Sequence, residues 1–466
     1  MSEEYISKFI KTNGENIHRC SYCKSRRKTI PLDDLAEPMH NVFSLYYTCR
    51  TNGDLYYGYV FGESAEEVIY ECLGVDDEIQ SDLHEILQEN YNDHYDCTTT
   101  YDDDFTYKRT HHLTEELDVK WEEIKTSLQS EARFFNSHVK AFFEQIFSDL
   151  ESHITHDGSN AITYIDSNAS LFRARVFGSL DKVENALKHP ENEFGPPPHQ
   201  YATSGRMNAQ GIPVFYGAMS SDIAIAEVRP AVGSYVVVAQ FKPVRPLRIL
   251  DISALDKLIP STDSLFDPAT TEKLAISSFL KRLSYKLTIP ISGARTDSEY
   301  LITQAVSEYL SVSEVNALDG IKFKSTQKAC DENSNESSYN IVLFTKSSAV
   351  AGAENKKTEY AVTMYEYDCD DDSYHQYLSP EICKKEVKAK RKHFYGIDTE
   401  EQINISLQLD INSLAIHEIK GVTYQHEEHK IKNGKPIEKM IKMTPSMRRI
   451  YFDKNSQFIS RNKDAT

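Results

Sequence analysis

The sequence has no hydrophobic run long enough to cross a membrane. Its longest apolar stretch runs from Tyr235 to Phe241, whereas a membrane-spanning helix needs roughly 20 apolar residues. The first residues, MSEEYISKFIKTNGE, contain no apolar segment of the kind that marks an export signal. We therefore expect a cytoplasmic protein without membrane contact, whose 8 cysteines are reduced thiols.

Acidic residues outnumber basic residues in the sequence. The chain of 466 residues has 52 Lys and Arg against 71 Asp and Glu, a net charge of -19. Such a chain lacks the uniformly basic surface that displaces counterions from nucleic acid or from an anionic membrane. We therefore expect no broad nucleic-acid binding, whereas a local basic pocket for a phosphorylated small molecule stays compatible with this charge.

Several common active-site motifs are also absent. The sequence contains no GxxxxGK[ST], no GxGxxG, no GxSxG and no HExxH. These motifs mark P-loop NTPases, Rossmann dinucleotide-binding proteins, α/β hydrolases and zinc proteases. The easiest assignments to those classes are therefore excluded.

The apolar patterns predict an α+β protein of three regions, consistent with the length. Residues 1–160 are predicted to be a mainly helical extension, 162–350 a mixed catalytic domain, and 351–466 an α+β extension. Between Leu117 and Leu150, apolar side chains at helical spacing form one stripe, in which we include Phe134 and Phe135. This stripe must be buried, either within the first region or against the central domain near the mouth of its pocket. In the second case we expect the first region to limit activity.

Two short motifs in the first region allow a functional and a plain interpretation. Cys20-Ser-Tyr-Cys23 is half of a zinc site, which His18, His40 or Cys49 could complete; the alternative is two unpaired thiols. The segment from Arg133 to His138 matches the loose Rx4-6H pattern of HEPN ribonucleases, and the alternative is an ordinary structural helix. The stretch from Cys97 to Thr110 is predicted to be a polar loop.

The central region carries an ordered set of polar motifs. Leu171-Phe-Arg-Ala-Arg175 places two arginines on one face of a predicted strand. Next come Gly205-Arg-Met-Asn208, then Gly211-Ile-Pro-Val-Phe-Tyr216, and a short predicted helix that ends at Glu227. Much later the chain has Tyr300-Leu-Ile-Thr-Gln304, Asp319-Gly-Ile-Lys-Phe-Lys-Ser325 and Tyr339-Asn-Ile-Val-Leu-Phe344.

In order and spacing, these motifs resemble the RES domain family over about residues 162 to 345, and CSYC followed by PLDDLA resembles the extension of longer HEPN/RES-type proteins. The family is named for an Arg, a Glu and a Ser, and it includes toxins that consume NAD. The resemblance implies an ADP-ribosyltransferase-like fold and NAD as substrate. Met207 departs from the family, which commonly has an aromatic or other bulky residue there; we expect it to alter the packing of the pocket.

The resemblance also implies a set of site residues. Glu227, Arg206 and Ser325 are the expected catalytic residues, with Glu227 beside the ribose as charge on the sugar develops. Arg173 and Arg206 suit the pyrophosphate, and Tyr216 can stack on nicotinamide. Asn208 completes the NAD-binding set, with Arg175 and Gln304 as supporting residues.

The acceptor of the ADP-ribosyl group stays open. Phosphorolysis or hydrolysis would make the protein an NAD-degrading, toxin-like or defence enzyme, and transfer to a side chain would make it a protein ADP-ribosyltransferase. A further alternative is an RNA-acting HEPN-like or interaction module with a degenerate RES domain, which the intact Arg206, Glu227 and Ser325 oppose. The partners expected are NAD, inorganic phosphate, and an antitoxin or trigger protein.

Overall fold

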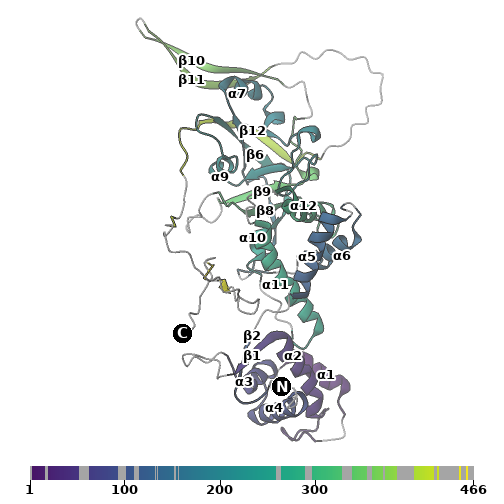
Figure 1. The fold of residues 1–466 in the computed structure, drawn as a ribbon. Coiled ribbons are helices and arrows are strands. Elements are labelled where there is room, and N and C mark those ends of the chain that lie inside the picture. The colour runs from purple at the N-terminus through teal and green to yellow at the C-terminus, as the bar shows by residue number, and fades with distance from the viewer. Residues whose placement is uncertain are drawn as a thin grey trace, which may run out of the picture. The chain divides into compact units, whose positions relative to one another are not determined.

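A computed structural model describes residues 3–15, 19–51, 62–92, 101–109, 115–131, 133, 135–151, 154–155, 157–258, 264–288, 296–327, 338–353, 359–370, 373–385, 404–423, 428–429, 451–452 and 458–459 (Figure 1). The chain divides into two units, Met1–Lys420 and Gly421–Thr466. Among the described residues, no helix is long and apolar enough to span a bilayer.

The N-terminal region is a small helical domain with one strand pair. Its core gathers side chains from four helices: α1 (Glu4–Asn13), α2 (Ala36–Tyr46), α3 (Ala65–Leu73) and α4 (Asp77–Tyr91). A capping box between Ser64 and Glu67 fixes the start of α3. Strand β1 (Tyr47–Thr51) pairs antiparallel with β2 (Phe105–Arg109). The prediction of a polar loop through Thr110 is therefore wrong for β2, whose Thr106 and Tyr107 are buried.

An eight-stranded mixed sheet forms the centre of the first unit, in the order β12-β6-β4-β5-β9-β8-β7-β3. Only β7 and β8 pair in parallel, and all the other neighbours are antiparallel. The strands are β3 (Ile162–Ile165), β4 (Leu171–Phe177), β5 (Phe215–Ala218), β6 (Tyr235–Pro243), β7 (Leu247–Asp251), β8 (Gly320–Lys324), β9 (Tyr339–Leu343) and β12 (Leu407–Glu418).

The two faces of this sheet enter different cores, because successive side chains on a strand point to opposite sides. On β9, Ile341 and Leu343 belong to one core, which also takes in α7 (Leu180–Leu187) and α8 (Pro190–Phe194). Val342 belongs to the other core, together with α11 (Pro268–Thr288) and α12 (Thr296–Val312). The α+β class predicted from the sequence is confirmed by the helical N-terminal region and this mixed sheet.

The apolar stripe between Leu117 and Leu150 is divided between two helices, α5 (Glu115–Ser130) and α6 (Ser137–Phe147). Both pack in the same core as α11 and α12, and Figure 1 shows these four helices side by side. The single tryptophan, Trp121, lies 5.8 Å from Phe279 of α11, measured between ring centroids. Phe135 does not belong to the stripe, since it is 96% exposed in the turn before α6, and Phe134 lies outside the described residues.

Residues beyond 350 extend the central sheet and add a hairpin. Strand β12 pairs with β6 at one edge of the sheet, with a register shift between Asp410 and Ala415. Strands β10 (Tyr360–Asp370) and β11 (Ser373–Lys384) pair with each other, and Met364 of β10 packs into the core with α7. In the second unit, β13 (Tyr451–Phe452) pairs antiparallel with β14 (Phe458–Ile459).

Candidate active site

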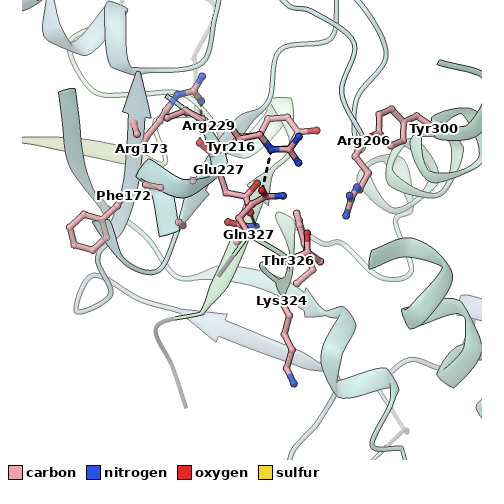
Figure 2. Close-up of a pocket in the computed structure, with 17 residues that line it drawn as sticks. Phe172, Arg173, Arg206, Tyr216, Glu227, Arg229, Tyr300, Lys324, Thr326 and Gln327 are labelled. Carbon is pink, nitrogen blue, oxygen red and sulfur yellow. Dashed lines mark hydrogen bonds between the residues drawn. The ribbon is translucent and has the colours of Figure 1, made fainter. Parts of the chain in front are cut away.

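A cavity of about 350 Å³ opens on the central sheet beside α9 (Ser221–Glu227) (Figure 2). Its floor includes one row of the sheet: strand register places Phe172, Ala218, Asn340 and Phe323 next to one another on β4, β5, β9 and β8. Its other lining residues are Arg173, Ala174, Arg206, Tyr216, Gly217, Ala224, Glu227, Val228, Arg229, Tyr300, Lys324, Thr326 and Gln327.

Glu227 presents its carboxylate to this cavity from the last position of α9. The helix begins with a side-chain cap, because the Ser220 hydroxyl accepts a hydrogen bond from the backbone N–H of Ile223. The Oε1 atom of Glu227 accepts two hydrogen bonds, each 2.7 Å long, from Ser325 Oγ and from Asn340 Nδ2. Two donors on one oxygen hold the carboxylate in a fixed orientation.

Ser325 and Asn340 reach Glu227 from the sheet. Ser325 follows β8, is 5% exposed, and does not itself line the cavity. Its Oγ also accepts from the backbone N–H of Gln327, so one hydroxyl joins the carboxylate to the following turn. Sequence reasoning identified Ser325 but gave no role to Asn340, although a polar residue within the apolar run of β9 is a usable signal.

Arg173 lies on β4 with its guanidinium largely desolvated. Its Nη1 donates to the backbone carbonyl of Tyr216 at 3.5 Å, and its Cζ lies 5.4 Å from the centroid of the Phe215 ring. Burial, and then the nearby charge of Arg175, lowers the pKa of Arg173 to about 10. The side chain therefore stays cationic at neutral pH. Arg175 points elsewhere, since it is exposed and forms an ion pair with Glu193.

The loop that carries Arg206 is held against α12. Thr303 Oγ1 donates to the backbone carbonyl of Arg206 at 2.6 Å, and Ser307 Oγ donates to that of Met207 at 2.7 Å. Gln304 Nε2 donates to the carbonyl of Gly205 at 2.8 Å. Arg206 itself lines the cavity, and its Nη1 donates to the carbonyl of Thr288. Met207 is buried in the core with α12, outside the cavity lining.

Tyr216 joins this loop to the sheet. Its hydroxyl accepts from the backbone N–H of Met207 at 2.9 Å and donates to Asn208 Oδ1 at 3.0 Å. Burial raises the pKa of Tyr216 to about 12, so the hydroxyl stays protonated and can keep donating. Asn208 does not line the cavity, and its amide donates to the carbonyls of Thr203, Ala209 and Ile212. Through these hydrogen bonds Asn208 stabilises the conformation of the loop that carries Arg206.

Sequence reasoning missed Arg229 and Lys324 as cavity residues. The Nε atom of Arg229 donates to Gln327 Oε1 at 3.1 Å. Arg229 follows α9 with a left-handed backbone (φ 45°), which is uncommon for a residue other than glycine. Figure 2 shows Arg173 and Arg229 on the same side of the cavity as Glu227, with Arg206 opposite. The described lining residues thus include four cations and one carboxylate, and Figure 2 shows that the side chain of Lys324 points away from Glu227.

The cysteine pair lies apart from this cavity. Cys20 and Cys23 line a different cavity, of about 890 Å³, in the N-terminal domain. Hydrogen bonds with Ser25 lower the pKa of Cys23 to about 7. His40 is turned away from them, since it stacks on Tyr91 and bonds to Tyr101. The described residues contain no group of three or more His, Cys, Asp or Glu placed to hold a metal, so zinc gains no support; His18 lies outside them.

The Rx4-6H segment does not lie on one helix. Arg133 lies in the turn between α5 and α6, whereas His138 lies in the first turn of α6. Both residues are exposed, and neither lines the cavity beside α9. The expectation of an Arg and a His close together on a helix is therefore wrong.

Comparison with known families assigns two domains to the chain. Residues 172–364 match the RES domain, and residues 13–142 match HEPN/RES N-terminal domain 1. The two matches, in this order along the chain, are those of a long-form RES protein with an N-terminal extension, and the resemblance drawn from its motifs is confirmed. No curated protein and no solved structure matches the chain. The cavity beside α9 lies within the RES domain.

Proposed function

We propose that the protein degrades NAD by breaking the N-glycosidic bond between nicotinamide and ribose, with phosphate or water as the acceptor. The RES domain supports this proposal, because the family includes toxins that consume NAD. The cavity beside α9 is the proposed active site, and its volume of about 350 Å³ lies within the usual range for ligand pockets.

The cations of the cavity suit the pyrophosphate of NAD. Arginine binds phosphate oxygens through two parallel charge-assisted hydrogen bonds, and Arg173 and Arg206 are the residues we assign to this role. The largely desolvated guanidinium of Arg173 would gain from an anionic partner. Arg229 and Lys324 add positive charge to a chain whose net charge is -19.

The single carboxylate of the described lining is the observation that carries the proposal. A glycosidase acting on a neutral leaving group uses two carboxyl groups, one of them to protonate the departing oxygen. Nicotinamide in NAD is already a cation, so it leaves as a neutral molecule with the bonding electrons and needs no acid. One carboxylate beside the ribose is then sufficient, and Glu227 fills that role.

The proposed reaction follows from this geometry. As the bond between C1′ and the nicotinamide nitrogen breaks, positive charge develops on the ribose, and the carboxylate of Glu227 stabilises it. Ser325 holds that carboxylate by its hydrogen bond, and the ring of Tyr216 offers a surface for nicotinamide. Phosphate or water then forms the new bond to C1′. With water, a proton is released to solvent.

The test is to incubate the full chain with NAD, with and without inorganic phosphate, and to identify the products by mass spectrometry. Free nicotinamide with ADP-ribose 1-phosphate indicates phosphorolysis, and free nicotinamide with ADP-ribose indicates hydrolysis. ADP-ribose attached to protein would replace the proposal with ADP-ribosyl transfer. NAD that stays intact under both conditions would refute the proposal.

A further inference from the structure

Asn340 has a buried hydrogen-bond acceptor without a partner. It is 6% exposed, and its Nδ2 donates to Glu227 Oε1, whereas its Oδ1 is buried and has no hydrogen bond among the described residues. The orientation of the amide is fixed by chemistry, because a carboxylate accepts hydrogen bonds and does not donate them. Oδ1 must therefore face away from Glu227.

Asn340 lines the cavity, so a ligand that shifts its side chain slightly would reach this acceptor, which has almost no accessible surface in the structure. Asn340 lines the cavity together with three members of its sheet row, Phe172, Ala218 and Phe323, which are all apolar. Ser325 already donates to the same oxygen of Glu227. Buried polar groups are nearly always hydrogen-bonded, and an unpaired one is costly to keep. An unpaired acceptor in the floor of a cavity thus points to a donor on the molecule that enters.

The proposed substrate limits what that donor can be. The phosphate oxygens of NAD accept hydrogen bonds at neutral pH and do not donate them. Near the bond that breaks, the donors are therefore the ribose hydroxyls and the NH2 of the carboxamide. Glu227 uses Oε1 for Ser325 and Asn340, and no described residue bonds to its Oε2. Glu227 Oε2 and Asn340 Oδ1 are therefore acceptors without a described partner on two side chains that bond to each other, and two acceptors suit the two adjacent hydroxyls of a ribose.

We propose that Asn340 Oδ1 accepts a hydrogen bond from one hydroxyl of the nicotinamide-side ribose, while Glu227 accepts from the other. This inference rests on the proposed function and adds a specificity to it: the pair recognises the intact 2′,3′-diol next to the bond that breaks. Asn340 thus acts twice, because its amide nitrogen positions Glu227 and its amide oxygen contacts the sugar.

The test compares kcat/KM for NAD with that for analogues lacking the 2′- or the 3′-hydroxyl of the nicotinamide-side ribose. We expect the unaltered chain to prefer NAD over each analogue by about tenfold or more, since a site built to bond a hydroxyl rejects its absence. In Asn340→Ala, one of these two preferences should fall to about threefold or less. The other should persist through Glu227.

Two controls separate recognition from positioning. Ser325→Ala removes the other donor to Glu227 Oε1 and leaves Asn340 Oδ1 in place, so it should slow cleavage yet keep both preferences. Asn340→Leu keeps the branched outline of the side chain without its polar atoms and suits the apolar neighbours. It should give the same result as Asn340→Ala, and it replaces that variant if the smaller side chain destabilises the fold. Thermal melting of each variant checks folding.

The outcomes distinguish this inference from the proposed function. Both preferences unchanged in folded Asn340→Ala and Asn340→Leu would mean that Asn340 only positions Glu227. An analogue with acetylpyridine in place of nicotinamide lacks the carboxamide amine. If the Asn340 variants lose only their discrimination against it, the donor is that amine, and the ribose assignment is wrong. An unaltered chain that cleaves none of these dinucleotides would overturn the proposed function, and this inference with it.

Discussion

Glu227 offers one carboxylate oxygen to Ser325 and Asn340, and both donors come from the sheet rather than from its own helix. A carboxylate held from two sides needs little reorganisation as charge develops on a bound sugar. This preorganisation is the usual source of electrostatic catalysis in enzymes. At the scale of single residues, the proposed chemistry depends on the negative charge of Glu227 and on the fork geometry of the arginines.

Replacing Glu227 by Gln should reduce NAD cleavage by at least about 10²-fold, equivalent to about 3 kcal/mol of transition-state stabilisation. Gln keeps the size and loses the charge, so the melting temperature should change little. The rate of nicotinamide release measures the effect. Asp222→Asn is the matched control, because Asp222 is an exposed carboxylate in the first turn of the same helix and does not line the cavity. Similar rates for the Gln variant and this control would remove Glu227 from the mechanism.

Replacing Arg206 by Lys should weaken NAD binding by about tenfold. Lys keeps the positive charge but loses the planar fork, and it also loses the present hydrogen bond from Nη1 to the carbonyl of Thr288. Calorimetric titration of NAD into the Glu227→Gln background would measure affinity without turnover. Arg175→Lys, on an arginine paired with Glu193 outside the cavity, should leave affinity unchanged. Equal affinities for both variants would mean that Arg206 does not hold the pyrophosphate.

The sequence identified the site residues that belong to the motifs of the family. Arg173, Arg206, Tyr216 and Glu227 all line one cavity, and Ser325 bonds to Glu227. Asn340 could not be placed beside Glu227 from spacing, because 113 residues separate them and only strand register brings them together. The role of Asn208 within its loop likewise depends on backbone carbonyls whose positions no sequence pattern specifies.

At the scale of elements, α12 connects the core to the cavity. Its Thr303 and Ser307 donate to backbone carbonyls of the Arg206 loop, and α5 and α6 pack against α12 within one core. The orientation of Arg206 therefore depends on α12, whose Tyr300 also lines the cavity, and through it on α5 and α6. The sequence predicted the short helix that ends at Glu227, which is α9. It failed for β2, which is short and polar at its exposed positions.

Replacing Thr303 by Val should raise the KM for NAD about threefold to tenfold with a smaller change in kcat. Val is nearly isosteric, but it lacks the hydroxyl that donates to the carbonyl of Arg206 at 2.6 Å, and one hydrogen bond is worth about 1 kcal/mol. Steady-state kinetics with NAD measure the split between KM and kcat. Ser311→Ala, which removes an exposed hydroxyl on the same helix, should leave both unchanged. A KM unaffected in Thr303→Val would show that α12 does not position Arg206.

At the scale of the molecule, the N-terminal region and the RES domain share buried surface. Helices α5 and α6 contribute Trp121, Phe142 and Phe143 to the core that contains Phe279 of α11. Leu274, also on α11, packs into the core of the N-terminal domain, where Tyr46 bonds to Thr271. Of the two locations that the sequence left open for the apolar stripe, packing against the central domain is therefore present. Sequence could predict that the stripe is buried, but not against which surface.

A chain shortened to begin at residue 162 should be insoluble or should melt at a markedly lower temperature than the full chain. It would expose the apolar faces of α11 and α12 that α5 and α6 now cover, and large exposed apolar patches promote aggregation. A chain beginning at residue 115 keeps those two helices and is the matched control. Thermal melting and size-exclusion chromatography compare the two. A soluble chain from residue 162 that consumes NAD faster than the full chain would instead support inhibition by the N-terminal region.

The release of nicotinamide from NAD by the full chain is the direct test of whether Glu227 catalyses cleavage of the N-glycosidic bond. Chromatography with absorbance detection follows free nicotinamide over time at equal concentrations of the unaltered protein and its Glu227→Gln variant. We expect one nicotinamide for each NAD lost, and a rate at least about 10²-fold lower in the variant. No nicotinamide from well-folded unaltered protein, or equal rates from both proteins, would contradict it.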